Sequence, residues 1–367
     1  MASSVGIVGG GWYGCHIAST LRSLGFSVRL FEQSSRLMHL ASGNNQFRLH
    51  LGFHYARHHR TRIQSRDGFW RFVERYPDLS KAVDQNIYAV PLKESSIDFQ
   101  TYKIIMSASG IEFIELGNLP EQIVNVQGAL STSERVLLTS AARNYFTGHL
   151  RENITLNYCV REIKQTGNSA SIDGQYFDFV IDTTWGHFTK CQIDVIYEPT
   201  LLLYYELIDG DFPAITFVDG PLCSVYPTEN PKIFTLSSVP HTPLGQFHSS
   251  REAVRHLSTV SRSQVAIKRQ LMEDQISFYV PSFNSRFRFI GPQLAIKTKP
   301  IGALDDRSCY VHQKERVFSV LSGKVDNIFF AAEQIIEKIS MSDELNNFSN
   351  VSTLLDDIGI TALGLQE

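Results

Sequence analysis

The segment Gly9–Gly14 (GGGWYG) constrains the fold most, because Gly9, Gly11 and Gly14 form the pattern G-x-G-x-x-G. The motif follows a short apolar run at 5–8 and precedes apolar residues at helical spacing. Its first glycine permits a tight turn, the second lets the backbone approach a pyrophosphate, and the third lets helix and strand pack closely. The sequence therefore predicts a βαβ unit that binds a dinucleotide, and a glycine-rich turn without a ligand is the alternative.

A second apolar run ends on Glu32, which lies at the expected distance of about 20 residues from the motif. An acid at this place accepts hydrogen bonds from the ribose hydroxyls of the dinucleotide. We add Gln33, the next residue, to the predicted cofactor-binding set. Trp12 and Tyr13 fill the free positions of the glycine motif; we include them in that set, although packing is their more typical role.

The composition indicates an ordinary globular protein. The chain has 367 residues, of which 43% are hydrophobic and 19% charged, and a net charge of −3. This length favours two domains, or one large domain with insertions. The small net charge argues against nucleic acid as the main partner without excluding it, and no apolar run is long enough for a bilayer. The five cysteines are scattered, so we expect a reducing, cytoplasmic environment.

The order of apolar segments predicts an α/β fold with two parts. After the βαβ unit, an apolar run leads to a break at Gly186, and a last strand at 316–321 precedes a helix at 324–339. Between them, 197–280 alternates short strands with proline- and glycine-bearing turns, which is typical of an antiparallel sheet. We expect a helix at 132–146 and a strand at 277–280. The predicted parts are a Rossmann-like nucleotide-binding domain (1–85, 120–195 and 296–345), an antiparallel-sheet α+β substrate domain (86–119 and 196–295), and a C-terminal tail (346–367).

The stretch 44–55, NNQFRLHLGFHY, is too polar for a core strand and too aromatic for an ordinary loop. Together with the glycine motif, the acid at Glu32 and the segment LSGKVDNIFFAA at 321–332, it resembles the D-amino-acid-oxidase-like superfamily of FAD-dependent oxidoreductases. Dehydrogenases of 2-hydroxyglutarate and glycerol 3-phosphate in that superfamily carry a similar loop, which is matched here by Asn45, Leu49, His50, Gly52 and Tyr55. The order of elements resembles the superfamily along nearly the whole chain. The usual G-x-G of the last turn is replaced by Ser322-Gly323-Lys324-Val325, so the chain resembles a divergent branch.

The resemblance implies FAD as the cofactor and a glycine-oxidase-like arrangement of the two domains. The loop 44–55 would then run past the flavin ring. It would place Asn44, Asn45, Gln46 and Arg48 against the cofactor, and Gly186, Gly323, Lys324 and Val325 would approach the cofactor from other turns. Lys324, or the helix N-terminus there, would stabilise negative charge on the reduced ring.

The resemblance also suggests residues that meet the substrate. We expect Arg48 and His50 in catalysis with Tyr226 and Lys299, and His54, Tyr55, Tyr204 and His241 in the substrate pocket. Lys299 would promote reaction with oxygen or bind a substrate anion. His50 could attach FAD covalently, whereas a histidine satisfied by the backbone is its structural alternative, and an internal salt bridge is the alternative for Arg48.

The predicted activity is FAD-dependent oxidation of a C–N bond in an amine or amino acid, by hydride transfer to flavin N5. The amino group could belong to a larger scaffold such as a sugar or modified nucleotide. The electron acceptor would be O2 or another small molecule, and no metal constellation is evident. Oxidation of a hydroxy acid or sugar alcohol is one alternative. A non-redox, mutase-like flavoenzyme and a non-catalytic dinucleotide-binding module are the others.

Overall fold

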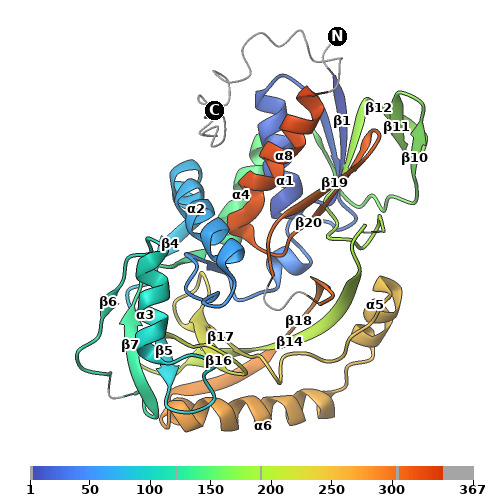
Figure 1. Ribbon diagram of the computed structural model, residues 1–367. Coiled ribbons are helices and arrows are strands. Elements are labelled where there is room, and N and C mark those ends of the chain that lie inside the picture. Colours follow the sequence, from blue (N-terminus) through green and yellow to red (C-terminus); the bar gives the residue numbers. More distant parts are fainter. Residues whose placement is uncertain (1–2, 121, 191, 303–305, 342–367) are drawn as a thin grey trace.

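The computed structural model describes residues 3–120, 122–190, 192–302 and 306–341, and the predicted tail at 346–367 lies outside the described residues. The chain is organised around a six-stranded sheet and an eight-stranded sheet, which lie at opposite ends of the molecule (Figure 1). In the described residues no helix is both long and apolar enough to cross a bilayer.

The six-stranded sheet has the order β19-β20-β13-β1-β2-β9. Its neighbours pair in parallel, except for β19 and β20. This arrangement brings the glycine motif, which follows β1, to the sheet edge where β13 and β20 also end. The strands are β1 (Ser4–Val8), β2 (Ser27–Phe31), β9 (Ile154–Thr155), β13 (Phe179–Asp182), β19 (Tyr310–Lys314) and β20 (Val317–Leu321).

Helices cover one face of this sheet and a small meander covers the other (Figure 1). The helices are α1 (Trp12–Ser23), α2 (His59–Arg75), α4 (Thr139–His149) and α8 (Ile328–Ser340), and α1 packs against both α4 and α8. The meander consists of β10 (Ile163–Thr166), β11 (Ser169–Ile172) and β12 (Gln175–Phe177). Ile172 and Phe177 pack there against Val8 and Val180 of the sheet. The predicted Rossmann-like part is confirmed.

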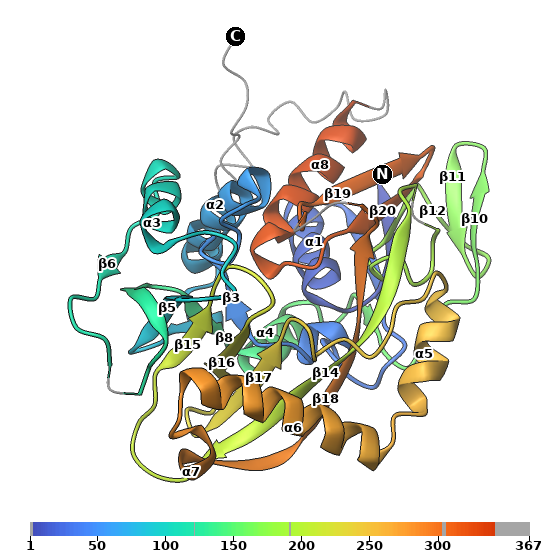
Figure 2. The ribbon, with the colours of Figure 1, turned by 60° about the horizontal axis from the view of Figure 1, so that its bottom comes forward.

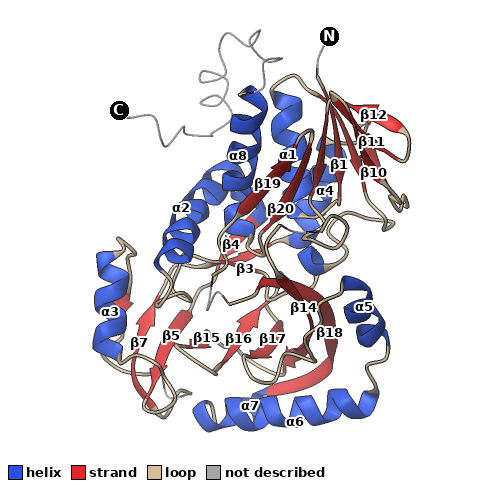
Figure 3. Ribbon diagram, turned by 45° about the vertical axis from the view of Figure 1, so that its right-hand side comes forward, coloured by secondary structure: helices blue, strands red, loops and turns tan. Residues whose placement is uncertain are grey.

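The eight-stranded sheet has the order β18-β14-β17-β16-β15-β5-β7-β6 and forms the base of the molecule (Figure 3). The strands are β5 (Asn86–Pro91), β6 (Ile114–Glu115), β7 (Val126–Ser131), β14 (Val195–Leu207), β15 (Ala214–Phe217), β16 (Cys223–Pro227), β17 (Ile233–Ser238) and β18 (Phe287–Pro300). Its helices are α3 (Phe99–Ala108), α5 (Ser250–Ser258), α6 (Arg262–Tyr279) and α7 (Phe283–Arg286). Figure 2 shows α6 running across the outer face, where Met272 and Ile276 pack against Leu203 and Leu236.

A third sheet, in the order β3-β8-β4, lies between the two large ones (Figure 3). It contains β3 (Arg48–Leu49), β4 (Ser80–Ala82) and β8 (Arg135–Leu137), and the short helices η1 (Ala41–Gly43), η2 (Pro77–Leu79) and η3 (Val325–Asn327) complete the described elements. The start of the 44–55 segment therefore crosses the molecule between its two main layers.

Several predicted elements differ from the structure. The helix expected at 132–146 is wrong in its first turns, because β8 pairs with β3 and β4 and α4 begins only at Thr139. The strand expected at 277–280 is wrong as well. Its residues end α6, whose Ile276 and Tyr279 are buried at helical spacing.

The eight-stranded sheet is antiparallel except between β15 and β5, which run in parallel. Strand β7 pairs with β5 in this sheet, although we assigned 120–195 to the nucleotide-binding part.

The contact between α2 and the turn before α8 depends on a glycine. A Cβ atom at Gly68 of α2 would lie 1.8 Å from the carbonyl oxygen of Asp326. No side chain fits at that distance, so the missing Cβ is what lets α2 pack directly on η3.

We expect Gly68→Ala to lower the free energy of unfolding by about 1–3 kcal/mol, the usual cost of overpacking. Urea denaturation of the variant measures this loss. Gly148→Ala is the matched control, since Gly148 is an exposed residue of α4 with no atom within 4 Å of its would-be Cβ. The free energy of unfolding of Gly148→Ala should rise by about 0.5–1 kcal/mol, because alanine has a higher helix propensity than glycine. Equal stability of Gly68→Ala and the parent would contradict the contact.

Candidate active site

The turn between β1 and α1 has the tight geometry that the glycine motif predicts. Gly9 has a φ of +105°, and a Cβ at Gly14 would lie 1.9 Å from the Gly9 carbonyl oxygen. The N–H group of Gly10 donates to Glu32 Oε2 over 2.7 Å, and the N–H group of Ser34 donates to Oε1 over 2.8 Å. The carboxylate of Glu32 is thus held at the glycine turn.

The other residues predicted around this turn have different surroundings. Gln33 is exposed. The Trp12 side chain is buried and makes edge contacts with Phe72 and Phe146, so the predicted role of this side chain in cofactor binding is corrected to core packing. The hydroxyl group of Tyr13 donates to the carbonyl oxygen of Lys324 and links α1 to the turn before α8.

The amides at the start of the 44–55 segment hold the segment itself. Asn44 Nδ2 donates to the carbonyl oxygens of His39 and Leu40, and Asn45 Nδ2 donates to those of Ala41 and Ser42. The predicted contact of these two side chains with the flavin stays a prediction. Gln46 reaches further, because its amide exchanges hydrogen bonds with the hydroxyl group of Ser224 in β16.

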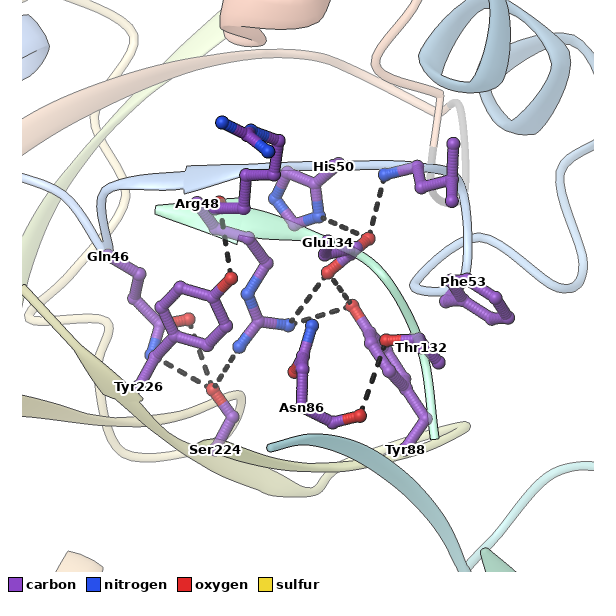
Figure 4. Close-up of polar contacts among 12 residues, drawn as sticks. Gln46, Arg48, His50, Phe53, Asn86, Tyr88, Thr132, Glu134, Ser224 and Tyr226 are labelled. Carbon is purple, nitrogen blue, oxygen red and sulfur yellow. Dashed lines mark hydrogen bonds and ion pairs between the residues drawn. The ribbon is translucent and has the colours of Figure 1, made fainter. Parts of the chain in front are cut away.

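A buried polar cluster joins this segment to the eight-stranded sheet (Figure 4). Arg48 Nη1 donates to the hydroxyl oxygen of Tyr88 over 2.8 Å, and that hydroxyl group donates to Glu134 Oε2 over 2.7 Å. The N–H group of Leu51 donates to Glu134 Oε1 over 2.8 Å. The guanidinium group of Arg48 stacks on the Tyr226 ring, with its carbon 4.0 Å from the ring centroid. Arg48 is therefore held on several sides.

The charges of this cluster balance each other. Glu134 is completely buried and its carboxylate lies 3.8 Å from Arg48 Nη1. Burial raises the pKa of Glu134, and the positive charge of Arg48 opposes that shift. The predicted alternative for Arg48, an internal salt bridge, is what the structure contains. Tyr226 is also occupied, because its hydroxyl group donates to the Arg135 carbonyl oxygen and its ring supports Arg48; its predicted catalytic role stays a prediction.

Two histidines lie beside the cluster without hydrogen-bond partners at Nδ1. The rings of His50, His54 and Tyr55 contact one another, with centroids 5.4–5.8 Å apart. The Nδ1 atoms of His50 and His54 are buried and unpartnered within the described residues. Burial, together with Lys324 and Arg48, holds the pKa of His50 well below its usual value, and burial and Arg48 lower that of His54 to about 3. Both imidazoles are therefore neutral near pH 7.

Lysines bring positive charge to the same place. Lys324 is buried, its Nζ lies 3.9 Å from the centroid of the Tyr55 ring and 3.9 Å from Asp326 Oδ1, and it has no hydrogen-bond partner in the described residues. Burial and Lys299 lower the pKa of Lys297 to about 8. Lys299, which we predicted to be catalytic, forms an ion pair with Glu198.

The remaining predicted residues are spread more widely. Tyr204 is half-buried and its hydroxyl oxygen accepts from Gln293. His241 follows β17 and lies near Lys268 of α6, and its predicted place in the substrate pocket stays a prediction.

Two predicted glycine turns and the start of the last helix can also be placed. Gly186 has a φ of +76°, and Gly323 lies against the indole ring of Trp185. The last α-helix starts at Ile328 rather than Lys324, because Val325–Asn327 forms a 3₁₀ turn.

Sequence reasoning missed Glu134, Tyr88 and Ser224. Glu134 stands in the segment TSERVLL, which resembles a helix start, and Tyr88 and Ser224 stand in ordinary strand patterns. Lys297 was not among the predicted site residues either. Their meeting depends on strands that are distant in the sequence, so no local signal could have found them.

The unpartnered polar atoms fit a polar cofactor. Ser322 Oγ, Lys324 Nζ and Asn327 Oδ1 are buried and lack hydrogen-bond partners in the described residues, as do the two histidine Nδ1 atoms. Buried polar groups are normally satisfied, so such a group of orphans indicates a binding partner. Their donors and acceptors suit the heteroatoms of a flavin ring. The glycine turn suits the pyrophosphate of FAD.

Comparisons with known proteins show the family of the chain. Residues 7–75 match the model of an NAD(P)-binding Rossmann-like domain. The chain is 58% identical over 336 residues to the FAD-dependent monooxygenase FPY4 of Fusarium mangiferae, covering 92% of this chain and 91% of that protein. The chain belongs to this family of FAD-dependent oxidoreductases. It is 29% identical over 370 residues to the FAD-dependent monooxygenase kojA of Aspergillus flavus, with 92% and 85% of the two chains covered.

Solved structures confirm the D-amino-acid-oxidase-like fold of this FAD-dependent oxidoreductase. Glycine oxidase from Geobacillus kaustophilus aligns with a TM-score of 0.68 and 14% identity, covering 92% of this chain and 94% of that chain. L-alpha-glycerophosphate oxidase from Mycoplasma pneumoniae, with FAD bound, aligns with a TM-score of 0.70, 12% identity and the same coverage. The predicted fold class is thus confirmed, and membership of an FAD-dependent family agrees with the predicted cofactor.

The low pKa values make the stability of the protein dependent on pH. The pKa of His16 and that of His54 are lowered to about 3, mainly by burial, from an ordinary value of 6.5. Groups that bind protons less readily when folded contribute stability above about pH 6.5, and this stability is lost as the pH falls towards 3. We expect the urea midpoint to fall steadily from about pH 7 to pH 4.

The double variant His16→Gln/His54→Gln should show a weaker dependence over the same range. His248→Gln is the control, since this side chain is exposed in the folded chain as it is in the unfolded one. If the double variant kept the full slope of the parent, the two buried histidines would not cause it.

Proposed function

We propose that this enzyme oxidises a carbon–nitrogen bond in a small amine or amino acid that carries an anionic group, with O2 as the electron acceptor. The observation that carries the proposal is the meeting of neutral His50 and His54 with the cations Lys297 and Lys324. A site of this kind can hold an anionic substrate and accept a proton from it.

The residues divide this work by their chemistry. A lysine ammonium group in a buried site attracts a carboxylate more strongly than it would in water. A neutral imidazole is suited to take the proton that the substrate nitrogen must lose. Bound FAD supplies the redox step, since it accepts the hydride from the carbon that bears the nitrogen. The imine that results would be hydrolysed to a carbonyl compound and an amine or ammonia.

The structural neighbours support this choice through their names. They include glycine oxidase and NikD, the latter described as an unusual amino acid oxidase, with TM-scores of 0.68 and 0.67. The similarity to L-alpha-glycerophosphate oxidase keeps oxidation of a hydroxyl-bearing carbon as the first alternative, for which the same histidines and lysines would serve.

Monooxygenation is a second candidate function, favoured by the names of the two related fungal proteins. It would transfer one oxygen atom of O2 to the substrate and reduce the other to water, with electrons from a reduced nicotinamide cofactor. The proposed oxidation places both electrons of the substrate on O2, forms hydrogen peroxide and takes the product oxygen from water.

Anaerobic mixing of the holoenzyme with panels of amines, amino acids and hydroxy acids tests the proposal. Bleaching of the flavin spectrum by an amine or amino acid, followed by release of hydrogen peroxide in air, would support it. Reaction with hydroxy acids alone would replace C–N by C–O oxidation. Label from ¹⁸O2 in the product, with a requirement for NADPH or NADH, would establish monooxygenation instead.

We expect Lys297→Met to raise the KM of an anionic substrate about 10- to 100-fold, because a charged hydrogen bond is lost. Steady-state kinetics measures this, and flavin absorbance checks that FAD content is retained. Lys164→Met is the control, since Lys164 lies in β10 of the meander and pairs there with Glu162. Its KM should stay at the parent value. An unchanged KM in Lys297→Met would remove Lys297 from the substrate site.

A further inference from the structure

We propose that Glu134 is a positioning residue that holds His50 as its Nδ1–H tautomer and so presents Nε2 as the proton acceptor. The assignment of the tautomer stands on the geometry of the site, whereas its use in the reaction rests on the proposed function. Neither Glu134 nor its contacts can be recognised from the sequence motifs.

The distance between the two groups supports this role. Glu134 Oε1 lies 3.8 Å from His50 Nδ1, which is buried and has no hydrogen-bond partner among the described residues. A shift of about 0.9 Å would bring the pair to a normal hydrogen-bond length of about 2.9 Å. The same Oε1 atom already accepts from the N–H group of Leu51, the residue next to His50. The carboxylate is therefore tied to the backbone that carries the imidazole.

The carboxylate is also fixed from the opposite side. Its Oε2 accepts from the hydroxyl group of Tyr88 and lies 3.8 Å from Arg48 Nη1. Arg48 in turn stacks on Tyr226 and donates to Tyr88. These contacts immobilise Glu134, and the positive charge of Arg48 favours its ionised, acceptor-only form.

The other charged groups around His50 favour the same tautomer. The groups that act on the protonation of His50 are Lys324, Arg48, His54 and Lys297, which are cations or, for His54, a neutral ring. A carboxylate is an acceptor for Nδ1–H, whereas none of the ammonium and guanidinium groups can accept a hydrogen bond. The tautomer of a histidine follows the hydrogen bond that its other nitrogen makes.

The consequence for the reaction is a defined proton path. When the N–H or O–H bond of the substrate breaks, its electron pair stays on the heteroatom and its proton moves to Nε2 of His50. The imidazolium that forms keeps its Nδ1–H directed at the carboxylate, which stabilises the new positive charge. Glu134 acts through His50 and does not touch the substrate.

The tautomer can be measured directly in the holoenzyme. Protein labelled with ¹⁵N-histidine is recorded at about pH 7.5, and His50 is assigned by the signals that disappear in His50→Gln. We expect a protonated, pyrrole-like Nδ1 and an unprotonated, pyridine-like Nε2 for His50. An Nε2–H tautomer in the parent protein would overturn the proposal without the need for any variant.

Variants then separate positioning from general support. Glu134→Gln should populate the Nε2–H tautomer of His50 and lower kcat about 100-fold, the size of a general-base contribution, with FAD content and KM little changed. Tyr88→Phe removes the hydrogen bond that the Tyr88 hydroxyl group donates to Glu134 Oε2. It should lower stability but leave the His50 tautomer as in the parent. His54, in the same spectra, is the internal control and should keep its tautomer in both variants.

The outcomes distinguish this inference from the proposed function. If the tautomer changes in Glu134→Gln but His50→Gln turns over normally, Glu134 positions His50 and the proposed proton acceptor is wrong. If the tautomer is unchanged in folded Glu134→Gln, or if Tyr88→Phe changes it equally, Glu134 has only a structural role and the inference fails.

Discussion

The buried pair of Arg48 and Glu134 is the interaction on which the site depends. It joins β3 and the residue before β8 to Tyr88 of β5, and so connects the middle sheet to the eight-stranded one. Burying two charges costs several kcal/mol for each ion, and this cost is recovered only when every partner is in place. Removing one member would leave the other charged in an apolar interior. The pair therefore fixes the position of the 48–55 segment relative to both main layers.

The rest of the site is arranged around this fixed segment. Gly68 lets α2 approach η3 closely, and Lys324, the residue before η3, lies over the face of the Tyr55 ring. Strand β18 brings Lys297 in from the eight-stranded sheet, and Lys299 is neutralised there by Glu198. The result combines neutral imidazoles with the ammonium groups of Lys297 and Lys324, the latter 3.9 Å from Asp326 Oδ1. In such a site the ammonium groups can bind an anion while an imidazole accepts a proton, because different side chains carry out the two tasks.

The chain's own motifs predicted the nucleotide-binding half well. The glycine turn and the acid at Glu32 depend on a spacing that is visible in the sequence. The 44–55 segment was also singled out, because its composition is unusual, and its contact with the flavin stays a prediction. Predictions failed where pairing decided the outcome. The segment after residue 132 has helix-like composition but completes a sheet, and the residues 277–280 have strand-like composition but end α6.

The sequence by itself determined the βαβ unit and its dinucleotide-binding turn, because glycine spacing carries that information. Only the tertiary structure decided which polar side chains are free to act. Arg48, Tyr226 and Lys299 all had the right chemistry for catalysis, yet each is occupied by a buried partner that lies far away in the sequence. Charge and hydrogen bonding depend on distance in space, and strand pairing, which the sequence does not display, sets that distance.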